Sequence, residues 1–260
     1  MSSRLRTGRE GAQRVAAIYD IHANLPALEA VIEDIRRAEV DQIVVGGDVF
    51  PGPMPVETIR YLLDCDIPLH FIRGNGDREV FASMRGAETS SLPQQAREAI
   101  QWVAQQLSRE NRELIASWPK SIRMRIGGWG EVLFCHATPR NDTEMFTRLT
   151  PEEWLLPVFN GLDVDGVVCG HTHMQFDRKI GGIRVVNAGS VGMPFGEPGA
   201  YWLLLKPEVE LRRTQYDFAK AAERIRRTNY PQAEEFAARN ILRPPSQREM
   251  LEAFSRVELN

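Results

Sequence analysis

The sequence predicts an α/β fold, and three observations support that prediction. Short apolar runs alternate with segments whose apolar residues recur at helical spacing, which is typical of a mostly parallel sheet with functional loops at the carboxyl ends of its strands. The length of 260 residues suits one large domain with appendages. Hydrophobic residues make up 43% of the chain and charged residues 26%, a composition that excludes a disordered or low-complexity protein.

The first part of the chain predicts three strands separated by two helices. Residues 15–19 form an apolar run, and a helix follows over residues 25–35, where apolar side chains repeat at helical spacing. Residues 42–45 predict the second strand, residues 56–63 the second helix and residues 68–72 the third strand. Each strand leads into a turn rich in Gly, Asp or Asn.

The remainder of the chain divides into a helical segment, a strand-rich part and a helical tail. Five further strands are expected, over residues 122–126, 132–135, 167–169, 183–186 and 201–205. The sequence Thr-Pro-Glu-Glu after residue 149 predicts a helix start. We therefore expect a flexible or disordered N-terminus over 1–13, a main domain over 14–213 with a helical cap or insertion at 78–118, and a helical C-terminal extension over 214–260.

Charge and cysteine usage narrow the class of partner and the compartment. The formal net charge is −3 and the pI is about 6.0, so no global field gathers nucleic acid, and extended nucleic acid is not expected as a partner. No apolar run approaches the roughly 18 residues of a membrane span. Cys65, Cys135 and Cys169 lack CxxC spacing, which favours a reducing, cytoplasmic location, with Cys135 and Cys169 packed in the core.

Side chains that can bind metal follow predicted strands in five separate segments. They are Asp20 and His22 in DIH, Asp48 in GGDV, Asn75 and Asp77 in GNGD, His136 in FCHA, and His171 and His173 in GHTH. Taken singly, each residue is more often a helix cap or a hydrogen-bonded structural residue. Taken together they favour a shared site, because four of the five histidines of the chain lie in these segments and only His70 lies elsewhere.

The residue types and their spacing indicate a pair of metal ions. Side chains two apart on an extended segment point the same way, so Asp20 with His22 and His171 with His173 can each form a convergent pair. Carboxylate oxygens and neutral imidazoles suit Mn²⁺, Fe or Zn²⁺, with Mg²⁺ or Ni²⁺ as further candidates. One carboxylate shared by two cations would hold them about 3.5–4 Å apart, and Asp48 is the natural bridge.

The ordered motifs resemble those of the calcineurin-like metallophosphoesterase superfamily. The segments DIHANLPALEAV, GGDVFPGP, GNGDRE, GHTHMQFDR and NAGSVGMP look like its small prokaryotic branch of phosphodiesterase-like and diadenosine-tetraphosphatase-related proteins. The resemblance implies a four-layer αββα sandwich of two mixed β-sheets flanked by helices, with the metal site at strand-end loops. It assigns one metal to Asp20, His22, Asp48 and His173. It assigns the other metal to Asp48, Asn75, His136 and His171.

The resemblance also implies an activity. A dinuclear metal-dependent phosphoesterase is expected, hydrolysing small phosphodiesters or phosphomonoesters by attack of a metal-bridging hydroxide, with Asp48, Asn75 and His136 in the catalytic roles. A dinucleoside polyphosphate hydrolase, a phosphoprotein phosphatase and a non-catalytic interaction scaffold are the alternatives. The expected partner is a small phosphorylated substrate such as a nucleotide, and the helical tail fits self-association into a homo-oligomer.

One departure from the family pattern and several neighbouring residues bear on the substrate. Gly76 stands where many relatives place a His that assists the leaving group, which favours activated or pyrophosphate-like substrates. Asn24 is either a substrate contact or a helix cap, and Arg78 and Arg140 either grip phosphate or form salt bridges. Asp77 is expected to orient a metal ligand.

Two further segments of the sequence have alternative roles. Residues 187–190 offer either backbone N–H groups to a ligand or a tight turn. The segments over 78–118 and 137–169 either form a cleft over the site or serve packing alone.

Overall fold

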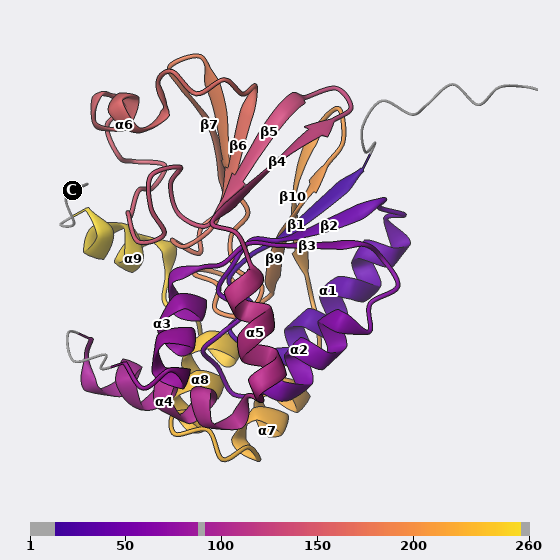
Figure 1. The fold of residues 1–260 in the computed structure, drawn as a ribbon, viewed down its shortest axis with the longest axis vertical. Coiled ribbons are helices and arrows are strands. Elements are labelled where there is room, and N and C mark those ends of the chain that lie inside the picture. The colour runs from indigo at the N-terminus through magenta and orange to yellow at the C-terminus, as the bar shows by residue number, and fades with distance from the viewer. Residues whose placement is uncertain (1–13, 88–91, 256–260) are drawn as a thin grey trace, which may run out of the picture.

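The computed structural model describes residues 14–87 and 92–255, which form two five-stranded sheets stacked face to face with helices outside them (Figure 1). The four-layer arrangement and the mixed character of both sheets are thereby confirmed. The flexible N-terminus expected over residues 1–13 lies outside the described residues.

The first sheet has the strand order β10-β9-β1-β2-β3. β1 (Val15–Ile18) pairs in parallel with β2 (Gln42–Val45), which pairs in parallel with β3 (Leu69–Phe71). β9 (Ala200–Leu205) and β10 (Val209–Thr214) extend the sheet beyond β1 by antiparallel pairing. The parallel β1-β2-β3 unit is the one that the alternation of strands and helices predicts.

The second sheet has the order β4-β5-β6-β8-β7. β4 (Ser121–Ile126) pairs antiparallel with β5 (Gly130–Cys135), and β6 (Gly166–Cys169) lies parallel between β5 and β8 (Ile183–Asn187). β7 (Phe176–Ile180) closes the sheet antiparallel to β8.

The strand pattern of the sequence missed β7 and β10. Their sequences, FDRKI and VELRRT, carry charged residues at alternate or adjacent positions, and both strands lie at a sheet edge. Charged side chains on an edge strand discourage pairing with a second chain. The charges that hide these strands from an apolar pattern therefore suit their position in the sheets.

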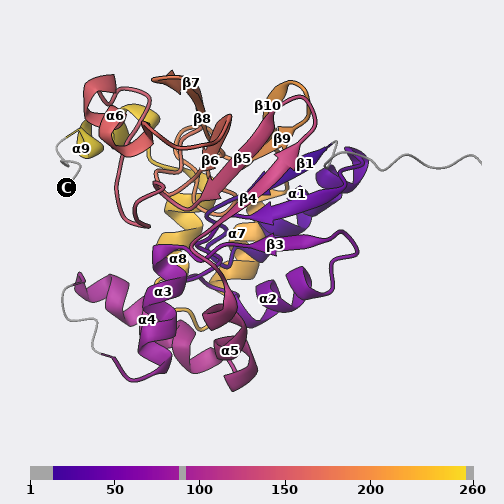
Figure 2. The same ribbon diagram turned by 45° about the horizontal axis from the view of Figure 1, so that its top comes forward.

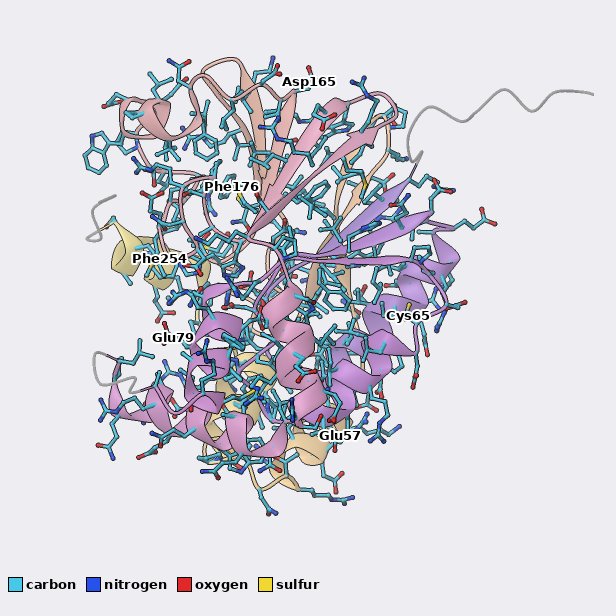
Figure 3. All side chains as sticks on the ribbon, viewed as in Figure 1. Glu57, Cys65, Glu79, Asp165, Phe176 and Phe254 are labelled. Carbon is cyan, nitrogen blue, oxygen red and sulfur yellow. The ribbon has the colours of Figure 1, made fainter. Side chains whose placement is uncertain are left out.

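Alternation along the strands sorts the core into layers. Val15 of β1 and Phe134 of β5 point into the space between the sheets, whereas their neighbours Ala16 and Leu133 point to the outer layers. Figure 3 shows side chains filling the spaces between these layers. Period-two patterning thus supplies both faces of each sheet with apolar contacts.

Helices cover both outer faces (Figure 2). The outer face of the first sheet is covered by α1 (Leu25–Arg37), α2 (Pro55–Leu63), α3 (Asn75–Met84), α4 (Gln94–Gln106) and α5 (Arg109–Ser117). α6 (Glu152–Phe159) covers the second sheet and begins where Thr-Pro-Glu-Glu predicts a helix.

The C-terminal helices pack on the side of α4. They are α7 (Phe218–Arg226), α8 (Ala233–Phe236), the π-helix η1 (Ala237–Leu242) and α9 (Gln247–Phe254). Ala99 of α4 shares a buried cluster with Ala222 of α7 and Ala237 of η1. Among the described helices, none has both the length and the apolar composition needed to cross a bilayer.

Candidate metal centre

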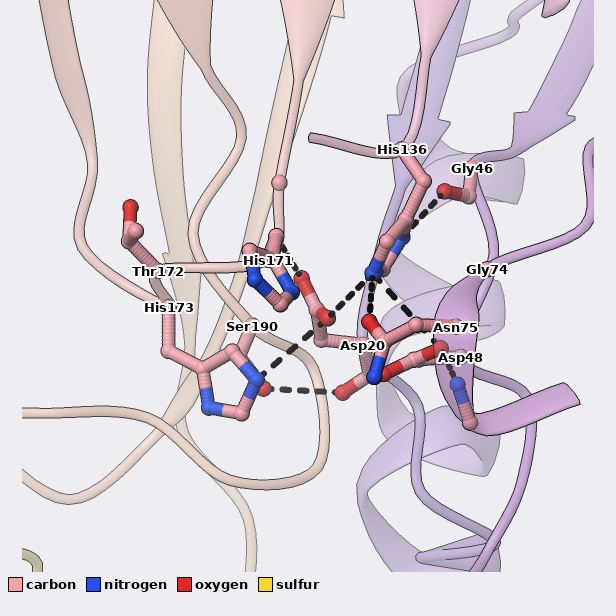
Figure 4. Close-up of polar contacts among 12 residues, drawn as sticks. Asp20, Gly46, Asp48, Gly74, Asn75, His136, His171, Thr172, His173 and Ser190 are labelled. Carbon is pink, nitrogen blue, oxygen red and sulfur yellow. Dashed lines mark hydrogen bonds and ion pairs between the residues drawn. The ribbon is translucent and has the colours of Figure 1, made fainter. Parts of the chain in front are cut away.

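Two groups of buried or half-buried side chains meet at one end of the two sheets (Figure 4). The first group is Asp20, His22 and His173, and the second is Asp48, His136 and His171. Within each group the ligand atoms lie within 4.8 Å of one another. One carboxylate and two imidazoles are a donor set suited to a divalent transition metal, so each group could hold one ion.

Asn75, the first residue of α3, joins the second group. One terminal atom of its side-chain amide lies 3.0 Å from both His136 Nε2 and His171 Nδ1. The Asn75 amide and the two imidazoles therefore converge on one point, where a single ion could contact all three. The structure therefore brings together all seven residues that the sequence predicts as metal ligands.

The two carboxylates lie between the imidazoles of the two groups. Asp48 Oδ2 is 3.9 Å from His22 Nε2, and Asp48 Oδ1 is 3.6 Å from His136 Nε2. Asp20 Oδ1 is 3.3 Å from His173 Nε2 and 3.9 Å from His136 Nε2. Because each Asp48 oxygen faces a different group, Asp48 has the placement that a bridging carboxylate needs.

Backbone carbonyls hold three of the imidazoles in orientations suited to metal binding. Nδ1 contacts a carbonyl oxygen in His22 (Pro51, 3.2 Å), His136 (Gly46, 3.0 Å) and His173 (Met193, 2.7 Å). An Nδ1–H that donates to a carbonyl fixes the neutral tautomer and leaves Nε2 as a lone-pair donor. These rings are therefore oriented by the backbone with Nε2 directed into the centre.

One buried carboxylate oxygen of the first group, Asp20 Oδ1, has no hydrogen-bond partner among the described residues. His171 Nε2 is also unpaired, but the nitrogen of that ring that converges with Asn75 and His136 is Nδ1. Buried polar atoms are nearly always paired in folded proteins, so each unpaired atom calls for an explanation. A cation in the first group would satisfy Asp20 Oδ1, and the donor set present fits that cofactor.

The backbone of these loops is strained where the ligands lie. Asp20, His22, Asp48, His171 and His173 have φ values of 52°, 47°, 50°, 66° and 56°. The left-handed region is uncommon for non-glycine residues, and each such residue costs about 1–3 kcal/mol. Strain concentrated on five of the seven predicted ligands indicates that the fold holds them in place for function.

The left-handed turns also correct one expectation about pairing. An extended geometry would direct His171 and His173 to the same side, but the structure places His173 in the first group and His171 in the second. That expectation was wrong because both residues have positive φ, which breaks the alternation of an extended strand. Asp20 and His22 do converge on one group, although they too lie in a turn.

Residues 187–190 hold two of the ligand loops in place by hydrogen bonds to their backbone. The Ser190 hydroxyl donates to the Asp20 carbonyl at 2.8 Å, and the Asn187 amide donates to the Gly170 carbonyl at 2.6 Å. Both side chains are fully buried. The tight-turn interpretation of this segment is therefore favoured, because its polar groups bind the loops rather than face a ligand.

Asp77 positions the loop that carries Asp48. Its carboxylate accepts hydrogen bonds from the backbone N–H groups of Asp48 (2.8 Å), Phe50 (3.0 Å) and Gly74 (2.9 Å). Burial, together with the nearby Asp48 charge, raises the pKa of Asp77 to about 7. Asp77 thus orients a predicted ligand through the backbone of that ligand.

Electrostatics within the centre keep the His22 and His171 imidazoles neutral, whereas the Asp20 carboxylate, against the effect of burial, raises the pKa of His173. Burial lowers the pKa of His22 and of His171 to about 3. Burial raises the pKa of Asp48, and the Asp20 charge adds to that effect. Burial opposes ionisation of Asp20 as well, but the His173 imidazole beside it holds the pKa of Asp20 below its usual value. His22 and His171 are therefore in the neutral form that coordinates metal.

The structure explains why residue 76 is glycine. A Cβ at this position would overlap the carbonyl oxygen of Phe50 and lie 2.9 Å from Pro51 Cδ. The Gly76 N–H also donates to Asp48 Oδ1 at 2.7 Å. A histidine side chain has no room here without movement of the 50–51 backbone, so the missing imidazole reflects the packing of this loop.

Asn24 serves the helix rather than the cavity. Its side chain accepts from the Ala27 N–H as N-cap of α1, donates to the Gly192 carbonyl at 3.0 Å, and is fully buried. The capping interpretation is confirmed. The substrate-contact interpretation is not supported, because the Asn24 amide is shielded from solvent.

Arg78 and Arg140 form salt bridges and also border a cavity beside His136. Arg78 pairs with Asp142 (2.8 Å) and Glu79 (2.6 Å), and Arg140 pairs with Glu144. The cavity has a volume of about 110 Å³ and is lined by both arginines, His136 and Lys120. Nothing in the sequence motifs singles out Lys120, which reaches this cavity from the start of β4.

The segment after His136 does not cover the centre with a helix. Leu155 and Phe159 of α6 pack on the outer face of the second sheet, beside Phe146. The packing interpretation of α6 is therefore favoured over a roof. Residues 138–142, which precede it, do line the cavity beside His136.

A sandwich of two mixed sheets with paired Asp and His clusters at one end defines the class of this protein. Residues 14–208 match the calcineurin-like phosphoesterase superfamily domain, and the chain belongs to that family.

Among particular relatives, an uncharacterized protein of Methanocaldococcus jannaschii is 29% identical over 243 residues, covering 84% of this chain and 94% of that protein. A hypothetical protein from Pyrococcus horikoshii has a similar structure, with a TM-score of 0.73, 21% identity, and 86% of this chain and 97% of that chain covered. A metallophosphoesterase from Sphaerobacter thermophilus gives a TM-score of 0.67, 25% identity, and 87% and 97% coverage.

Proposed function

We propose that this protein is a dinuclear metal-dependent phosphoesterase that hydrolyses small phosphodiesters or phosphomonoesters. The observation that supports this most strongly is the convergence of seven donor side chains from separate loops, among them the buried and unpaired Asp20 Oδ1. Membership of the calcineurin-like phosphoesterase family agrees with the reaction class. Retention of all the expected donors favours an enzyme over a non-catalytic scaffold.

The proposed metal assignments follow the two groups. The first ion is held by Asp20, His22, Asp48 and His173. The second is held by Asp48, Asn75, His136 and His171. Mn²⁺, Fe or Zn²⁺ suits these mixed oxygen and nitrogen donors. When bound, two such cations neutralise phosphate oxygens and make hydroxide available near neutral pH.

The protein's own residues orient this chemistry. Asp77 fixes the Asp48 loop through three backbone hydrogen bonds, and backbone carbonyls fix the rings of His22, His136 and His173. Because residue 76 has no side chain, the protein offers no imidazole there to protonate a leaving group. Activated esters and phosphoanhydrides are therefore the favoured substrates.

A dinucleoside polyphosphate hydrolase is the second candidate, and the cavity beside His136 favours it. Arg78, Lys120 and Arg140 bring three cationic groups to this cavity. The two arginines pair with Glu79, Asp142 and Glu144, whereas no salt bridge to Lys120 occurs among the described residues. A further phosphate group next to the scissile one would meet that positive charge. Location in the cytoplasm is part of the proposal, since Cys65, Cys135 and Cys169 are all free thiols.

Metal-stripped protein supplied in turn with Mn²⁺, Fe²⁺, Zn²⁺, Mg²⁺ or Ni²⁺ tests the proposal. Turnover of p-nitrophenyl phosphate, bis-p-nitrophenyl phosphate and diadenosine tetraphosphate is measured for each metal. We expect metal-dependent hydrolysis of at least one substrate. If the protein binds two ions per chain but hydrolyses none of the three substrates, the scaffold alternative is favoured.

A further inference from the structure

The two metal groups border different cavities. The cavity beside His136 is small and basic, whereas a second cavity of about 410 Å³ begins at His22. We call it the His22 cavity, and its lining includes Ala96, Phe195, Tyr230, Asn240 and Met250. Its volume lies within the range of about 300–1,000 Å³ that is usual for pockets binding small organic molecules.

Three segments distant in the sequence build the His22 cavity. Ala96 and Ala99 come from α4, and Phe195 comes from the loop before β9. The third wall is made by the C-terminal helices, through Phe236 of α8 and Met250 of α9. The C-terminal helices thus border the cavity that begins at the first metal group.

Aromatic rings give this cavity flat, fixed surfaces. Phe195 stacks on the ring of His173, with ring centroids 5.2 Å apart and planes at 26°. The ring centroid of Phe254, which is labelled in Figure 3, lies 6.1 Å from that of Phe195. Tyr230 meets Trp102 edge-on at 5.4 Å. Phe195 therefore links the wall of the His22 cavity directly to the first metal group.

Polar groups at the cavity are neutral in sum. Glu235 and Arg239 carry opposite charges and lie 3.7 Å apart, while Gln232 and Asn240 contribute uncharged amides. Amides both donate and accept hydrogen bonds, as the edges of nucleobases require. The lining of the cavity beside His136 by contrast holds three cationic side chains, of which Lys120 has no salt bridge among the described residues.

The helix that contributes Arg239 and Asn240 has unusual geometry. Residues Ala237–Leu242 form a π-helix directly after α8. π-Helical turns are rare and frequently occur at functional sites. Their presence in this wall is a second, independent indication that the C-terminal helices contribute to function.

We propose that the His22 cavity binds an uncharged, planar heteroaromatic group of the substrate, such as a nucleobase. This inference rests on the proposed phosphoesterase function and deepens it. The substrate class is then a nucleoside phosphoester or phosphoanhydride, with its nucleoside on the His22 side and its scissile phosphate at the metal groups. The C-terminal helices select that substrate.

Two substrates that share one leaving group test the proposal. Thymidine 5′-(p-nitrophenyl phosphate) and methyl p-nitrophenyl phosphate both release p-nitrophenolate and differ in the nucleoside. We expect the wild type to favour the thymidine ester at least tenfold in kcat/KM, since base–aromatic stacking is worth about 1–3 kcal/mol. Ala96→Phe fills the cavity, so we expect it to lower the ratio of the two kcat/KM values by at least about tenfold. The kcat/KM for the methyl ester is expected to stay within about twofold of the wild-type value.

Gln101→Phe is the matched control, because Gln101 is an exposed residue of the same helix and lies outside the lining. Met250→Trp fills the cavity from the opposite wall and replaces Ala96→Phe if that variant does not fold. Calorimetric binding of thymidine to metal-stripped protein gives a readout independent of turnover. We expect binding to the wild type and to Gln101→Phe, and none to the cavity-filling variant.

The possible outcomes separate this inference from the proposed function. Equal turnover of both esters by the wild type, or an equal loss of both in Ala96→Phe, overturns the inference and leaves the phosphoesterase intact. Preference for decyl p-nitrophenyl phosphate over the thymidine ester also overturns it, since the cavity then takes an acyl chain. Failure to hydrolyse any ester with any metal, with thymidine still bound, counts against the proposed function alone.

Discussion

The two sides of the metal centre differ in charge, size and origin. The cavity beside His136 is small, is lined by three cationic side chains, and is built from α3, the start of β4, the end of β5 and the loop after β5. The volume of the His22 cavity is nearly four times as large, its charged side chains cancel, and the C-terminal helices form part of its wall. The donor groups themselves are alike, each with one carboxylate and two imidazoles. The difference indicates that the donors set the reaction and the two flanks set the substrate.

The ion pairs of the basic side sharpen that comparison. Arg78 and Arg140 are held by carboxylates of Asp142, Glu79 and Glu144. Lys120 lines the same cavity, and no salt bridge to it is seen in the described part of the chain. Of the three cations that line this cavity, Lys120 is therefore the one whose charge is least neutralised by carboxylates.

The largest effect is expected for Asp48→Asn. Because Asp48 faces both groups, the loss of its charge is expected to weaken binding of both ions and to reduce hydrolysis by at least about a thousandfold. Turnover of bis-p-nitrophenyl phosphate and metal content per chain are the measurements. His173→Ala and His171→Ala serve as controls that each remove one donor from one group. Wild-type turnover by Asp48→Asn would exclude Asp48 as a bridge.

A smaller but clear effect is expected for Asp77→Ala. The change leaves three buried backbone N–H groups without a partner and frees the Asp48 loop, so we expect a loss of about 2–5 kcal/mol in the free energy of unfolding. Turnover is expected to fall about 10–100-fold, as for other residues that orient a metal ligand. Asp64→Asn, exposed at the end of α2, is the control. Unchanged turnover in a folded Asp77→Ala protein would contradict a positioning role.

Gly76→Ala is expected to destabilise the protein by about 1–3 kcal/mol, because an added Cβ overlaps the Phe50 carbonyl oxygen beside the centre. Thermal unfolding measures the effect. Gly86→Ala is not a fair control, since Gly86 has a positive φ, whereas Gly182→Ala meets no neighbouring atom within 4 Å. If Gly76→Ala is as stable as Gly182→Ala, the loop at Phe50 and Pro51 can move aside to accept the added Cβ at little cost in free energy.

The smallest effect is expected for Lys120→Ala, and it bears directly on the difference between the two sides. Removing one cation is expected to raise the KM for diadenosine tetraphosphate about 3–10-fold and to leave kcat and the turnover of bis-p-nitrophenyl phosphate unchanged. Arg140→Ala is expected to act in the same direction. Steady-state kinetics decide the matter. Equal changes in KM for diadenosine tetraphosphate and bis-p-nitrophenyl phosphate would show that the cavity beside His136 does not select the substrate.

Much of the fold follows from the sequence because local patterning specifies it. The β2 strand lies where the apolar run predicts it, and the donor residues come together because they follow strands that end at the same edge. The edge strands β7 and β10 were missed because charged residues replace the apolar pattern. Edge position is a property of the sheet rather than of the segment.

Details of the site depended on three-dimensional arrangement. The separation of His171 from His173 arises from left-handed turns that no spacing rule reports. Lys120 lines the cavity beside His136 because β4 lies beside β5, and Met250 lines the His22 cavity because α9 lies close to the loop before β9. Long-range packing therefore decides which residues surround the donors, while the motifs decide the donors themselves.

Metal stoichiometry coupled to activity tests the central claim most directly. Metal-stripped protein is dialysed against Mn²⁺, the bound ions are counted per chain by elemental analysis, and hydrolysis of bis-p-nitrophenyl phosphate is followed as the ions are added. We expect two ions per chain, with hydrolysis that appears only as the second ion binds. Binding of a single ion or none, or hydrolysis that persists after complete metal removal, would contradict a dinuclear phosphoesterase.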